Sequence, residues 1–308
     1  MDELVIGIDG GGTHCRTRLA NTRGETLGMG EAGAANPHAA GYAAAQHEIL
    51  GAIQRAFDDA KIEKQIVTAA CMGIGGIDRP DERAQFAEWA QQFIASRAHV
   101  VNDGEIVLAA GLPENWGIAL IAGTGSIAWG RTRDGKIARA GGWGYLIGDE
   151  GSGFDLAREA LRAATHYADG RGEPTHLLDA ILAHWHLDDA RRLIPHVYRS
   201  GLKPADFAEL APLVIRASET GDAVARRLVE RASESLAETI IAVAKILSFH
   251  DGKIPLALAG GLLLQAAPLR LNLMAELKRR KNRFAPVTLV AEPVVGAVRL
   301  AINLAHRK

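Results

Sequence analysis

One short pattern occurs twice in the sequence: a strand-like apolar run that ends in a glycine turn and is followed by two more strand-like runs. The first copy comprises residues 4–8, the turn Gly10-Gly11-Gly12-Thr13, and residues 16–20 and 26–30. The second copy comprises residues 118–122, the turn Gly123-Thr124-Gly125-Ser126, and residues 127–131 and 136–140. Alternation of polar and apolar residues within these runs is typical of half-buried strands. Two copies of one unit predict a duplicated α/β fold with a cleft between the copies.

Helical and further strand patterns follow each copy. The first copy leads into helices at residues 39–60, 81–96 and 105–111 and strands at residues 66–74 and 98–101. The second leads into helical sequence over residues 154–249, strands at residues 254–259 and 287–290, and a last helix at residues 296–306. A chain of 308 residues favours two domains. We expect them at residues 1–115 and 116–293, the second with a helical insertion, joined by ordered structure at residues 113–118.

The composition excludes several classes of protein. Hydrophobic residues make up 48% and charged residues 23%, as in ordinary globular proteins, and a formal net charge of -1 favours neither nucleic acid nor an anionic membrane. The two cysteines, Cys15 and Cys71, are too few for a disulfide framework and favour a reducing cytoplasm. The acidic start at Asp2 and Glu3 is unlike a signal peptide, and no apolar stretch is long enough to cross a bilayer. We therefore expect a cytoplasmic protein with neither nucleic-acid nor membrane partners.

Three glycine turns follow short apolar runs: the two turns above and Gly260-Gly261. Glycine lets a backbone approach an anion closely and supplies positive φ, and successive N–H groups can then surround the anion. The hydroxyl groups of Thr13, Thr124 and Ser126 add hydrogen-bond donors. A tight hairpin is the alternative for any single turn, but two turns in equivalent positions favour phosphate binding.

Other patterns have simpler interpretations. Residues 28–33 match G-x-G-x-x-G but end a strand, whereas a dinucleotide site must open a helix. Residues 130–136 match G-x-x-x-x-G-K, but Ile137 replaces the Ser or Thr that binds magnesium, and Asp134-Gly135 indicates a hairpin. Four histidines fit no common zinc spacing and are expected on solvated helix faces: His166, His176, His184 and His186.

Two aspartates directly follow strand-like runs. Asp9 precedes the first glycine turn, where a carboxylate can hold hydrated Mg²⁺ that bridges nucleotide phosphates; a turn-forming role is the alternative. Asp103 follows residues 98–101 and can accept a proton from an attacking hydroxyl, as phosphoryl transfer to an alcohol requires. The alternative role of Asp103 is to cap the helix that begins at Glu105, and both roles are compatible.

The segment 141–153 combines many glycines with two aromatic and two acidic residues. Ordering glycine costs much conformational entropy, so this composition favours a loop that lays backbone groups against a polyhydroxylated ligand. Asp149 can accept hydrogen bonds from two adjacent hydroxyls, and Trp143 either covers a sugar face or fills the core. Asn36 can bond a sugar hydroxyl or an amide, or form a turn before Pro37.

In this order, these pieces resemble the superfamily of acetate kinase, sugar kinases, heat-shock chaperones and actin. Within it, they are similar to the N-acetylglucosamine kinase branch, which is grouped with the BadF/BadG/BcrA/BcrD ATPases. The resemblance covers almost the whole chain. It rests on residues 7–13, Asn102-Asp103, residues 123–126, residues 141–153, Gly260-Gly261 and residues 292–297.

The resemblance implies two RNase-H-like domains that close over ATP and a sugar, with the last helix, residues 294–308, returning to the N-terminal domain. It implies ATP contacts from Gly10, Gly11, Gly12, Thr13, Gly123, Thr124, Gly125, Ala211, Gly260 and Gly261. It implies sugar contacts from Asn36, Asp103, Ser126, Gly142, Trp143, Gly144 and Asp149. The expected protein is a homodimeric, ATP-dependent kinase of an amino sugar, first of all N-acetylglucosamine. Asp103 would be the base on the 6-hydroxyl, and Asp9 would hold Mg²⁺ through water.

Departures from the family pattern leave alternatives open. Ile127 follows Ser126 where the animal enzymes have a polar residue, so glucosamine and N-acetylmuramic acid are alternative substrates. The activating ATPases of the family hold an iron–sulfur cluster through cysteines at a dimer interface. Cys15 and Cys71 fall inside expected strands, which counts against that activity. A non-catalytic sugar sensor is a further alternative; such a protein usually adds a DNA-binding segment, which we do not expect here.

Overall fold

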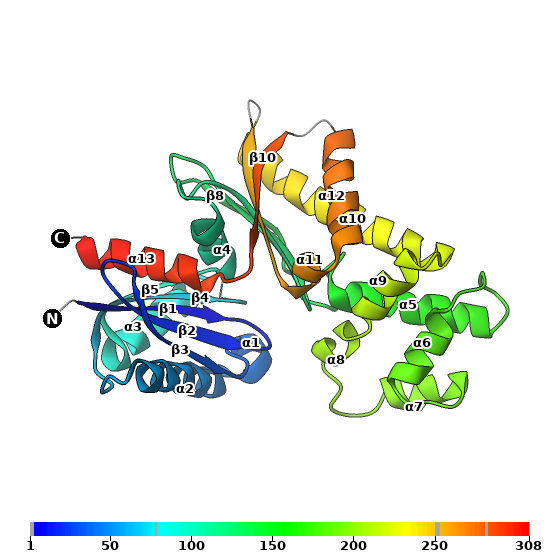
Figure 1. Cartoon of the computed structure of the whole chain (residues 1–308), viewed down its shortest axis with the longest axis horizontal. Helices are drawn as coiled ribbons and strands as arrows, with labels where there is room; N and C mark the ends of the chain where they lie inside the picture. The colour runs from blue at the N-terminus through cyan, green and yellow to red at the C-terminus, as the bar shows by residue number, and fades with distance from the viewer. Residues whose placement is uncertain (1–2, 78, 250–252, 281–282, 308) are drawn as a thin grey trace. The chain divides into compact units, whose positions relative to one another are not determined.

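The computed structural model describes residues 3–77, 79–249, 253–280 and 283–307 of the chain. The chain divides into two compact units (Figure 1). Unit 1 comprises residues 1–119, 130–135 and 290–308, and unit 2 comprises residues 120–129 and 136–289. The strands form two five-stranded sheets.

The first sheet lies in unit 1, with its strands in the order β3-β2-β1-β4-β5. The strands are β1 (Leu4–Gly10), β2 (Cys15–Asn21), β3 (Thr26–Ala32), β4 (Val67–Ile74) and β5 (Ala95–Val101). β2 pairs antiparallel with both β1 and β3, whereas β4 is parallel to both β1 and β5. The carboxyl ends of β1, β4 and β5 therefore meet at one edge of the sheet.

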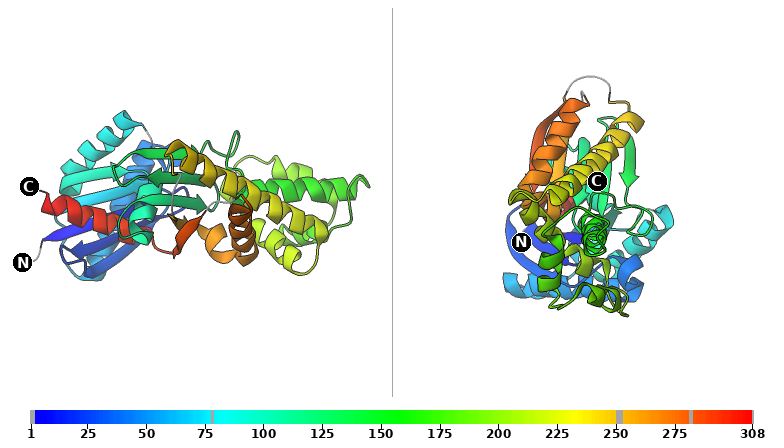
Figure 2. Two further views of the ribbon diagram at one scale, coloured as in Figure 1. Left: turned by 90° about the horizontal axis from the view of Figure 1, so that it is seen from above. Right: turned by 90° about the vertical axis from the view of Figure 1, so that its right-hand side faces the viewer.

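Helices cover both faces of this sheet, which explains why β1 is an almost continuous apolar run. They are α1 (Pro37–Ala40), α2 (Tyr42–Ala60), α3 (Pro80–Phe93), α4 (Asp103–Gly111) and α13 (Val294–His306). Ile6 and Ile8 of β1 are buried in a core shared with α2 and α3, and Val5 is buried in the opposite core shared with α4 and α13. Figure 1 shows α2 and α13 on opposite sides of the sheet, and the left view of Figure 2 shows the first strand (blue) and the last helix (red) beside each other in this unit.

The second sheet has its strands in the order β10-β9-β6-β7-β8. They are β6 (Gly117–Ala122), β7 (Ser126–Arg131), β8 (Ile137–Gly141), β9 (Ile254–Ala259) and β10 (Phe284–Val290). Read from β8, this order repeats that of the first sheet strand for strand, so the duplicated α/β fold predicted from the sequence is confirmed.

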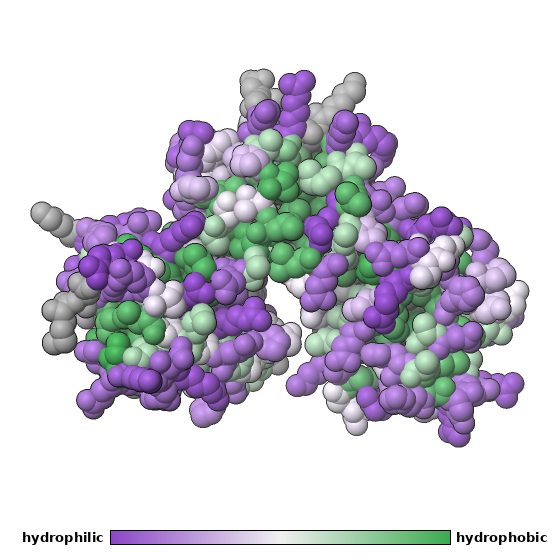
Figure 3. All heavy atoms as spheres, in the orientation of Figure 1, coloured by the Kyte–Doolittle hydropathy of each residue, from purple (hydrophilic) through white to green (hydrophobic). Residues whose placement is uncertain are grey.

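The helices of unit 2 fall between β8 and β9, or between β9 and β10. The first group is α5 (Gly153–Ala168), α6 (Leu177–His184), the 3₁₀ helix η1 (Ala190–Arg192), α7 (Leu193–Val197), α8 (Pro204–Ala208), α9 (Ala211–Glu219) and α10 (Ala223–Ile246). The second group is α11 (Gly261–Gln265) and α12 (Ala267–Arg279). Figure 3 shows hydrophobic side chains gathered over β10 and α12, where Val287, Leu289 and Leu271 are exposed. None of the described helices combines the length and the apolar character that crossing a membrane requires.

Two predicted helix boundaries were wrong. The helix expected over residues 81–96 ends at Phe93, and β5 begins at Ala95. The buried Ile94 leaves the helical conformation there, and its carbonyl accepts a hydrogen bond from the N–H of Val67 at 3.0 Å, so pairing with the sheet overrides helical periodicity. The helix expected over residues 39–60 is two helices, because Gly41 adopts a φ of 87° between them.

The glycines of two rejected motifs have structural roles. A Cβ atom on Gly28 would lie 2.1 Å from the carbonyl oxygen of Ala56, and one on Gly30 would lie 2.0 Å from that of Ala52. These glycines therefore let α2 pack closely on β3. Gly135 has a φ of 89°, as expected of a hairpin turn between β7 and β8. Among the described residues, no group of three or more His, Cys, Asp and Glu side chains could hold a metal ion.

Candidate functional site

The candidate residues of unit 1 lie at the edge where β1, β4 and β5 end. Asp9 is the second-last residue of β1, and Asp103 directly follows Asn102 at the end of β5. The turn Gly75-Gly76 follows β4, which lies between these two strands in the sheet. Ligand sites of α/β proteins form at the carboxyl ends of parallel strands, and two carboxylates meet at this one.

The first glycine turn connects β1 to β2. The N–H group of Gly11 donates to the carbonyl oxygen of His14 at 2.9 Å, which closes the hairpin. Gly12 and Thr13 are exposed, and their N–H groups have no acceptor among the described residues. These two donors and the Thr13 hydroxyl are available to an anion.

The expectation that these glycines supply positive φ was wrong for the first two turns. None of the glycines of residues 10–12 or 123–125 has a positive φ. Glycine is needed at residue 10 because a larger residue has no room there: a Cβ would lie 2.6 Å from Cδ1 of Ile74. In the third turn the expectation is correct, since Gly260 has a φ of 95°.

The Asp9 carboxyl has an unusual electrostatic environment. The pKa of Asp9 is raised to about 7, mainly by burial and to a smaller extent by the nearby Asp103 carboxylate. The positive charge of Arg16 lowers this pKa in part. The Asp9 side chain makes no hydrogen bond or ion pair with the other described residues. A bound divalent cation would favour the ionised form of Asp9, and Mg²⁺ characteristically binds one or two carboxylates together with water and phosphate oxygens. The residues present therefore fit this ion.

A stability measurement can test this description of Asp9. The pKa of Asp9 is near 3.8 in the unfolded chain and about 7 in the folded protein. Between pH 3.8 and pH 7, the folded state therefore keeps the proton on Asp9, whereas the unfolded state has lost it. The free energy of unfolding should therefore fall as the pH rises through this window. Asp9→Asn removes the ionisation, so we expect it to unfold at higher urea concentration than the wild type at pH 8, without nucleotide or divalent cation. At pH 5 the difference should be less than about half as large, because only the first part of the window between the two pKa values has then been crossed.

The control for this experiment is Asp188→Asn, which changes an aspartate whose side chain is 87% exposed. It should leave the unfolding curves unchanged at both pH values. A difference between Asp9→Asn and the wild type that is equal at pH 5 and pH 8 would contradict the raised pKa.

Asp103 is the first residue of α4, but it does not cap that helix. The cap is Asn102, whose side-chain oxygen accepts from the N–H of Gly104 at 2.8 Å, so the capping alternative for Asp103 was wrong. One carboxylate oxygen of Asp103 accepts from the same N–H at 2.9 Å. The other, Oδ2, faces Gly75, where a Cβ would lie 3.2 Å from it. One oxygen of this half-buried carboxylate is thus held by the backbone of α4, and the other points toward the turn Gly75-Gly76.

Asn36 lies at the same edge. Its Oδ1 caps α1 by accepting from the N–H of His38 at 2.9 Å, as the turn alternative proposed, while Nδ2 has no acceptor among the described residues. Gly76, with a φ of 85°, leaves room for this side chain, because its Cβ would lie 2.8 Å from Oδ1. Gly75 and Gly76 were not predicted as site residues, although a glycine pair after a buried strand is the same signal that identified the other turns.

The second glycine turn connects β6 to β7 in unit 2. The N–H of Gly123 donates to the carbonyl oxygen of Gly125 at 3.0 Å. The start of α5 closes on this turn: the N–H groups of Gly153 and Phe154 donate to the carbonyl oxygens of Gly123 and Thr124 at 2.7 and 3.2 Å. The N–H and hydroxyl groups of Thr124 have no partner among the described residues, so they remain available to a phosphate.

The third turn lies beside the second. A Cβ on Gly123 would lie 3.7 Å from the backbone nitrogen of Gly261, and one on Gly260 would lie 2.3 Å from the carbonyl oxygen of Ala122. Only glycine fits at residue 260. Ala211, the other predicted nucleotide contact in this unit, begins α9 and is 2% exposed, which leaves little side-chain surface for a ligand.

The loop 141–153 is built around the Asp149 carboxylate. Asp149 Oδ1 accepts from the N–H of Ser126 at 3.2 Å, and Oδ2 would lie 2.8 Å from a Cβ on Gly125. Burial raises the pKa of Asp149, and backbone hydrogen bonds from Ser126 and Gly144 oppose that rise. Asp149 therefore joins the loop to the second glycine turn, a role the sequence did not reveal.

Trp143 in this loop is not a core residue, so the core-filling alternative was wrong. Its side chain is 63% exposed, and the Arg139 guanidinium lies 4.9 Å from the ring centroid. Gly142, with a φ of 68°, packs on Ile127, because a Cβ there would lie 2.7 Å from Cδ1 of Ile127. Gly144 also has a positive φ, of 84°. The loop thus presents an aromatic face and backbone groups over an apolar base.

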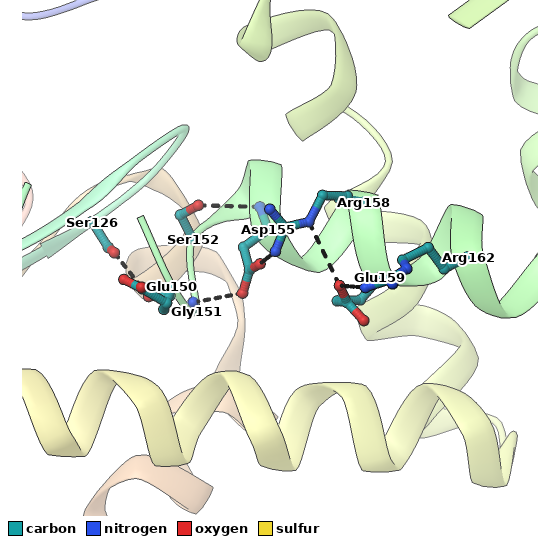
Figure 4. Close-up of polar contacts among 8 residues, drawn as sticks. All are labelled: Ser126, Glu150, Gly151, Ser152, Asp155, Arg158, Glu159 and Arg162. Atoms are coloured by element: carbon teal, nitrogen blue, oxygen red, sulfur yellow. Dashed lines mark hydrogen bonds and ion pairs between the residues drawn. The ribbon is translucent and has the colours of Figure 1, made fainter. Parts of the chain in front are cut away.

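Hydrogen bonds fix the end of the loop to α5 (Figure 4). The Ser126 hydroxyl donates to the carbonyl oxygen of Glu150 at 2.8 Å. The N–H of Gly151 donates to Asp155 Oδ2 at 2.9 Å, and the N–H of Asp155 donates to the Ser152 hydroxyl at 3.2 Å. The predicted sugar residue Ser126 is consequently held by the loop, whose last residues are in turn bonded to the first turn of α5.

The chain is similar in sequence and in structure to known amino-sugar kinases. An N-acetylmuramic acid/N-acetylglucosamine kinase of Clostridium acetobutylicum is 34% identical over 262 residues, which cover 85% of this chain and 86% of that protein. An N-acetyl-D-glucosamine kinase of Dictyostelium discoideum is 28% identical over an alignment 313 positions long, which covers 98% of each chain. A crystal structure from Chromobacterium violaceum, described as that of a candidate N-acetylglucosamine kinase, is 31% identical, with a TM-score of 0.80 over 97% of this chain and 99% of that one.

This structural likeness confirms the two-domain, actin-like ATPase fold that the resemblance implied. Residues 6–301 match the model of one protein family, which is nearly the whole chain. The chain therefore belongs to the BadF/BadG/BcrA/BcrD ATPase family.

Proposed function

We propose that this protein is an ATP-dependent kinase that phosphorylates the 6-hydroxyl of an amino sugar, with N-acetylglucosamine as the first candidate. The observation that carries the proposal is the pair of carboxylates, Asp9 and Asp103, at one sheet edge beside a glycine turn with unoccupied N–H donors. A phosphate-binding turn, a cation ligand and a base are the groups that phosphoryl transfer to an alcohol requires. The relatives to which this chain is similar are named as kinases of N-acetylglucosamine, and one of them also of N-acetylmuramic acid.

In this proposal Asp103 accepts the proton of the sugar hydroxyl as that oxygen attacks the γ-phosphorus. The N–H groups of Gly12, Thr13 and Thr124 donate to phosphate oxygens, whose negative charge they stabilise. Mg²⁺ bound at Asp9 through water would neutralise part of the phosphate charge. The remaining predicted phosphate and nucleotide contacts are Gly10, Gly11, Gly123, Gly125, Ala211, Gly260 and Gly261.

The sugar is proposed to bind through polar groups of both sequence copies. In unit 1 the donor is Nδ2 of Asn36, which has no acceptor among the described residues. In unit 2 the groups are Ser126, Gly142, Trp143, Gly144 and Asp149. Because one oxygen of Asp149 already holds the N–H of Ser126, this carboxylate offers the sugar its remaining lone pairs only. The exposed Trp143 ring supplies a face on which the sugar ring can stack.

The identity of the amino sugar depends on the space beside Ile127. This side chain packs under Gly142 and makes the base of the loop apolar, which suits the methyl of an N-acetyl group and offers nothing to a free amine. N-acetylglucosamine is therefore preferred, with N-acetylmuramic acid and glucosamine as the alternatives.

A coupled assay of ADP release over a panel of sugars tests this proposal. The panel is N-acetylglucosamine, glucosamine, N-acetylmuramic acid, N-acetylmannosamine and glucose. We expect kcat/KM to be highest for N-acetylglucosamine and at least about tenfold lower for glucosamine, since losing one well-placed group typically costs about 1–3 kcal/mol. ADP release at the same rate with every sugar, or with none, would reject the kinase proposal.

The structure gives no support to the alternative of an ATPase that drives redox chemistry. Cys15 and Cys71 are both fully buried within β2 and β4, and burial raises the pKa of both thiols, that of Cys15 to about 12. Iron–sulfur ligands must be accessible thiolates, which these cysteines are not. The unpaired Asp9 and the held Asp103 also favour an enzyme over a non-catalytic sugar sensor.

Three finer expectations complete the proposal: a requirement for Mg²⁺, a cytoplasmic location and a homodimeric state. The unpaired Asp9 carboxyl supports the first of these. The exposed apolar side chains over β10 and α12 support the last, since such patches often mark subunit interfaces (Figure 3).

A further inference from the structure

Unit 2 contains a cavity of about 270 Å³ between α5 and α10, which we call the α5–α10 cavity. None of its lining residues belongs to the glycine turns or to the loop 141–153. Its polar lining consists of Glu159, Arg162, His166, Glu173, Arg227 and Arg231. The cavity is slightly smaller than the pockets of roughly 300–1,000 Å³ that hold drug-sized ligands, so its occupant should be small.

The charges around the α5–α10 cavity favour an anion. Three arginines face two glutamates there, and Arg231 has no acidic partner among the described residues. Arg162 pairs with Glu159 at 3.1 Å and Arg227 pairs with Glu173 at 2.7 Å. The Arg227–Glu173 pair is solvent-exposed, and in the other pair Arg162 is 67% and Glu159 31% exposed, so neither pair contributes much to stability. An anion with several acceptor oxygens can therefore replace the glutamates.

A line of ionic contacts leads from this cavity to the loop 141–153 (Figure 4). Glu159 of the cavity contacts Arg158 at 3.5 Å as well as Arg162. Arg158 also pairs with Asp155 at 2.6 Å. Asp155 in turn accepts the hydrogen bond from the N–H of Gly151 within the loop. Arg158 is thus shared between a carboxylate of the cavity and a carboxylate that holds the loop.

We propose that the α5–α10 cavity binds a small phosphate-bearing dianion, and that this binding weakens the attachment of the loop 141–153. A phosphate group matches the ligand because its oxygens can each accept from the planar guanidinium groups of Arg162, Arg227 and Arg231. Once Arg162 turns to the phosphate, Glu159 loses one cationic partner and attracts Arg158 more strongly. Asp155 then loses the partner that fixes the position of its carboxylate, so the hydrogen bond that it accepts from Gly151 becomes weaker.

The consequence for ligand binding rests on the proposed function, in which this loop contacts the amino sugar. Phosphate in the cavity is then expected to weaken amino-sugar binding. By linkage, the amino sugar must weaken phosphate binding by the same factor. Two sources share the phosphate chemistry: free phosphate, and a phosphorylated amino sugar.

Isothermal titration calorimetry without any nucleotide or sugar tests the site itself, whatever the protein's activity. The probes are inorganic phosphate and glucosamine 6-phosphate, titrated into the wild type, Arg231→Ala and Lys245→Ala. Lys245→Ala is the matched control because it removes one exposed positive charge from the same helix, outside the cavity. We expect Arg231→Ala to bind at least about tenfold more weakly and the control to be unchanged, since one charge-assisted hydrogen bond is lost.

The comparison of probes identifies the source of the phosphate. Tighter, Arg231-dependent binding of glucosamine 6-phosphate indicates a phosphorylated sugar, and equal binding of both probes indicates free phosphate. No binding of either probe, or equal binding by Arg231→Ala and the wild type, would overturn the site.

The coupling is tested by repeating the phosphate titration with the amino sugar at saturation. We expect about fivefold weaker phosphate binding in the wild type, in the range typical of coupled sites. Arg158→Ala, which lies outside the cavity lining, should bind phosphate as the wild type does but lose this dependence on the sugar. If the sugar binds while phosphate affinity does not respond, or if Arg158→Ala keeps the response, the coupling is overturned. Absence of sugar binding would instead count against the proposed function.

Discussion

Asp103→Asn is expected to lower kcat by about 10²–10⁴-fold, the range that general-base catalysis contributes. The asparagine keeps the size of the side chain and can still accept from the N–H of Gly104, so α4 should begin as before. It cannot accept the hydroxyl proton. The dissociation constant for ATP, measured by calorimetry, should stay within about twofold of the wild-type value, because Asp103 is not assigned to the nucleotide.

The variant has a second readout, which tests the proximity of the two carboxylates. The Asp103 charge contributes to the raised pKa of Asp9, so Asp103→Asn should lower that pKa and reduce the loss of stability between pH 4 and pH 7. The matched control is Asp81→Asn, an exposed aspartate in the first turn of α3. Wild-type turnover in Asp103→Asn would remove this residue from the mechanism.

Gly296→Ala is expected to destabilise unit 1 strongly, although it adds only one methyl group. Gly296 lies in α13, where a Cβ would come within 1.9 Å of the carbonyl oxygen of Ile106 and 2.6 Å of the nitrogen of Ala110 in α4. Both contacts are with backbone, so α13 would have to move away from α4. Overpacking of this kind costs about 1–3 kcal/mol or more. The apparent Tm should fall by about 5 °C or more in a thermal melt.

Gly51→Ala provides a control of opposite sign. Gly51 lies in α2, and the nearest atom to its Cβ would be Nη1 of the flexible Arg55 side chain at 3.4 Å. Alanine is the better helix former, so a gain of up to about 1 kcal/mol is expected. If Gly296→Ala melted at or above the wild-type temperature, the close packing of α13 on α4 would be contradicted.

Most of the fold could be predicted from local patterns. The strands around both glycine turns end within one or two residues of their expected positions, because apolar or alternating patterns mark the strands and turn residues mark their ends. The exception at residues 94–96 is instructive. Helical periodicity continues through Ile94, but the bond that this residue accepts from Val67 is a long-range pairing, which no local pattern contains.

The candidate site was only partly predictable, for the same physical reason. Asp9 and Asp103 were identified because each comes at the end of an expected strand. What brings them together is the parallel pairing of β1, β4 and β5, and the raised pKa of Asp9 arises in part from that proximity. The bond from Asp149 to the second glycine turn spans 23 residues, and the role of Gly76 depends on the Asn36 side chain that fills its space. Neither contact can be predicted from the spacing of residues in the sequence.

We expect the protein to transfer the γ-phosphoryl group of ATP to the 6-hydroxyl of an amino sugar. Phosphorus NMR of the purified protein with ATP, Mg²⁺ and N-acetylglucosamine tests it most directly. We expect a phosphomonoester signal, coupled to the C6 protons of the sugar, that grows as fast as ADP appears, with no ADP formed when the sugar is omitted. Formation of inorganic phosphate at the same rate with and without the sugar would contradict it.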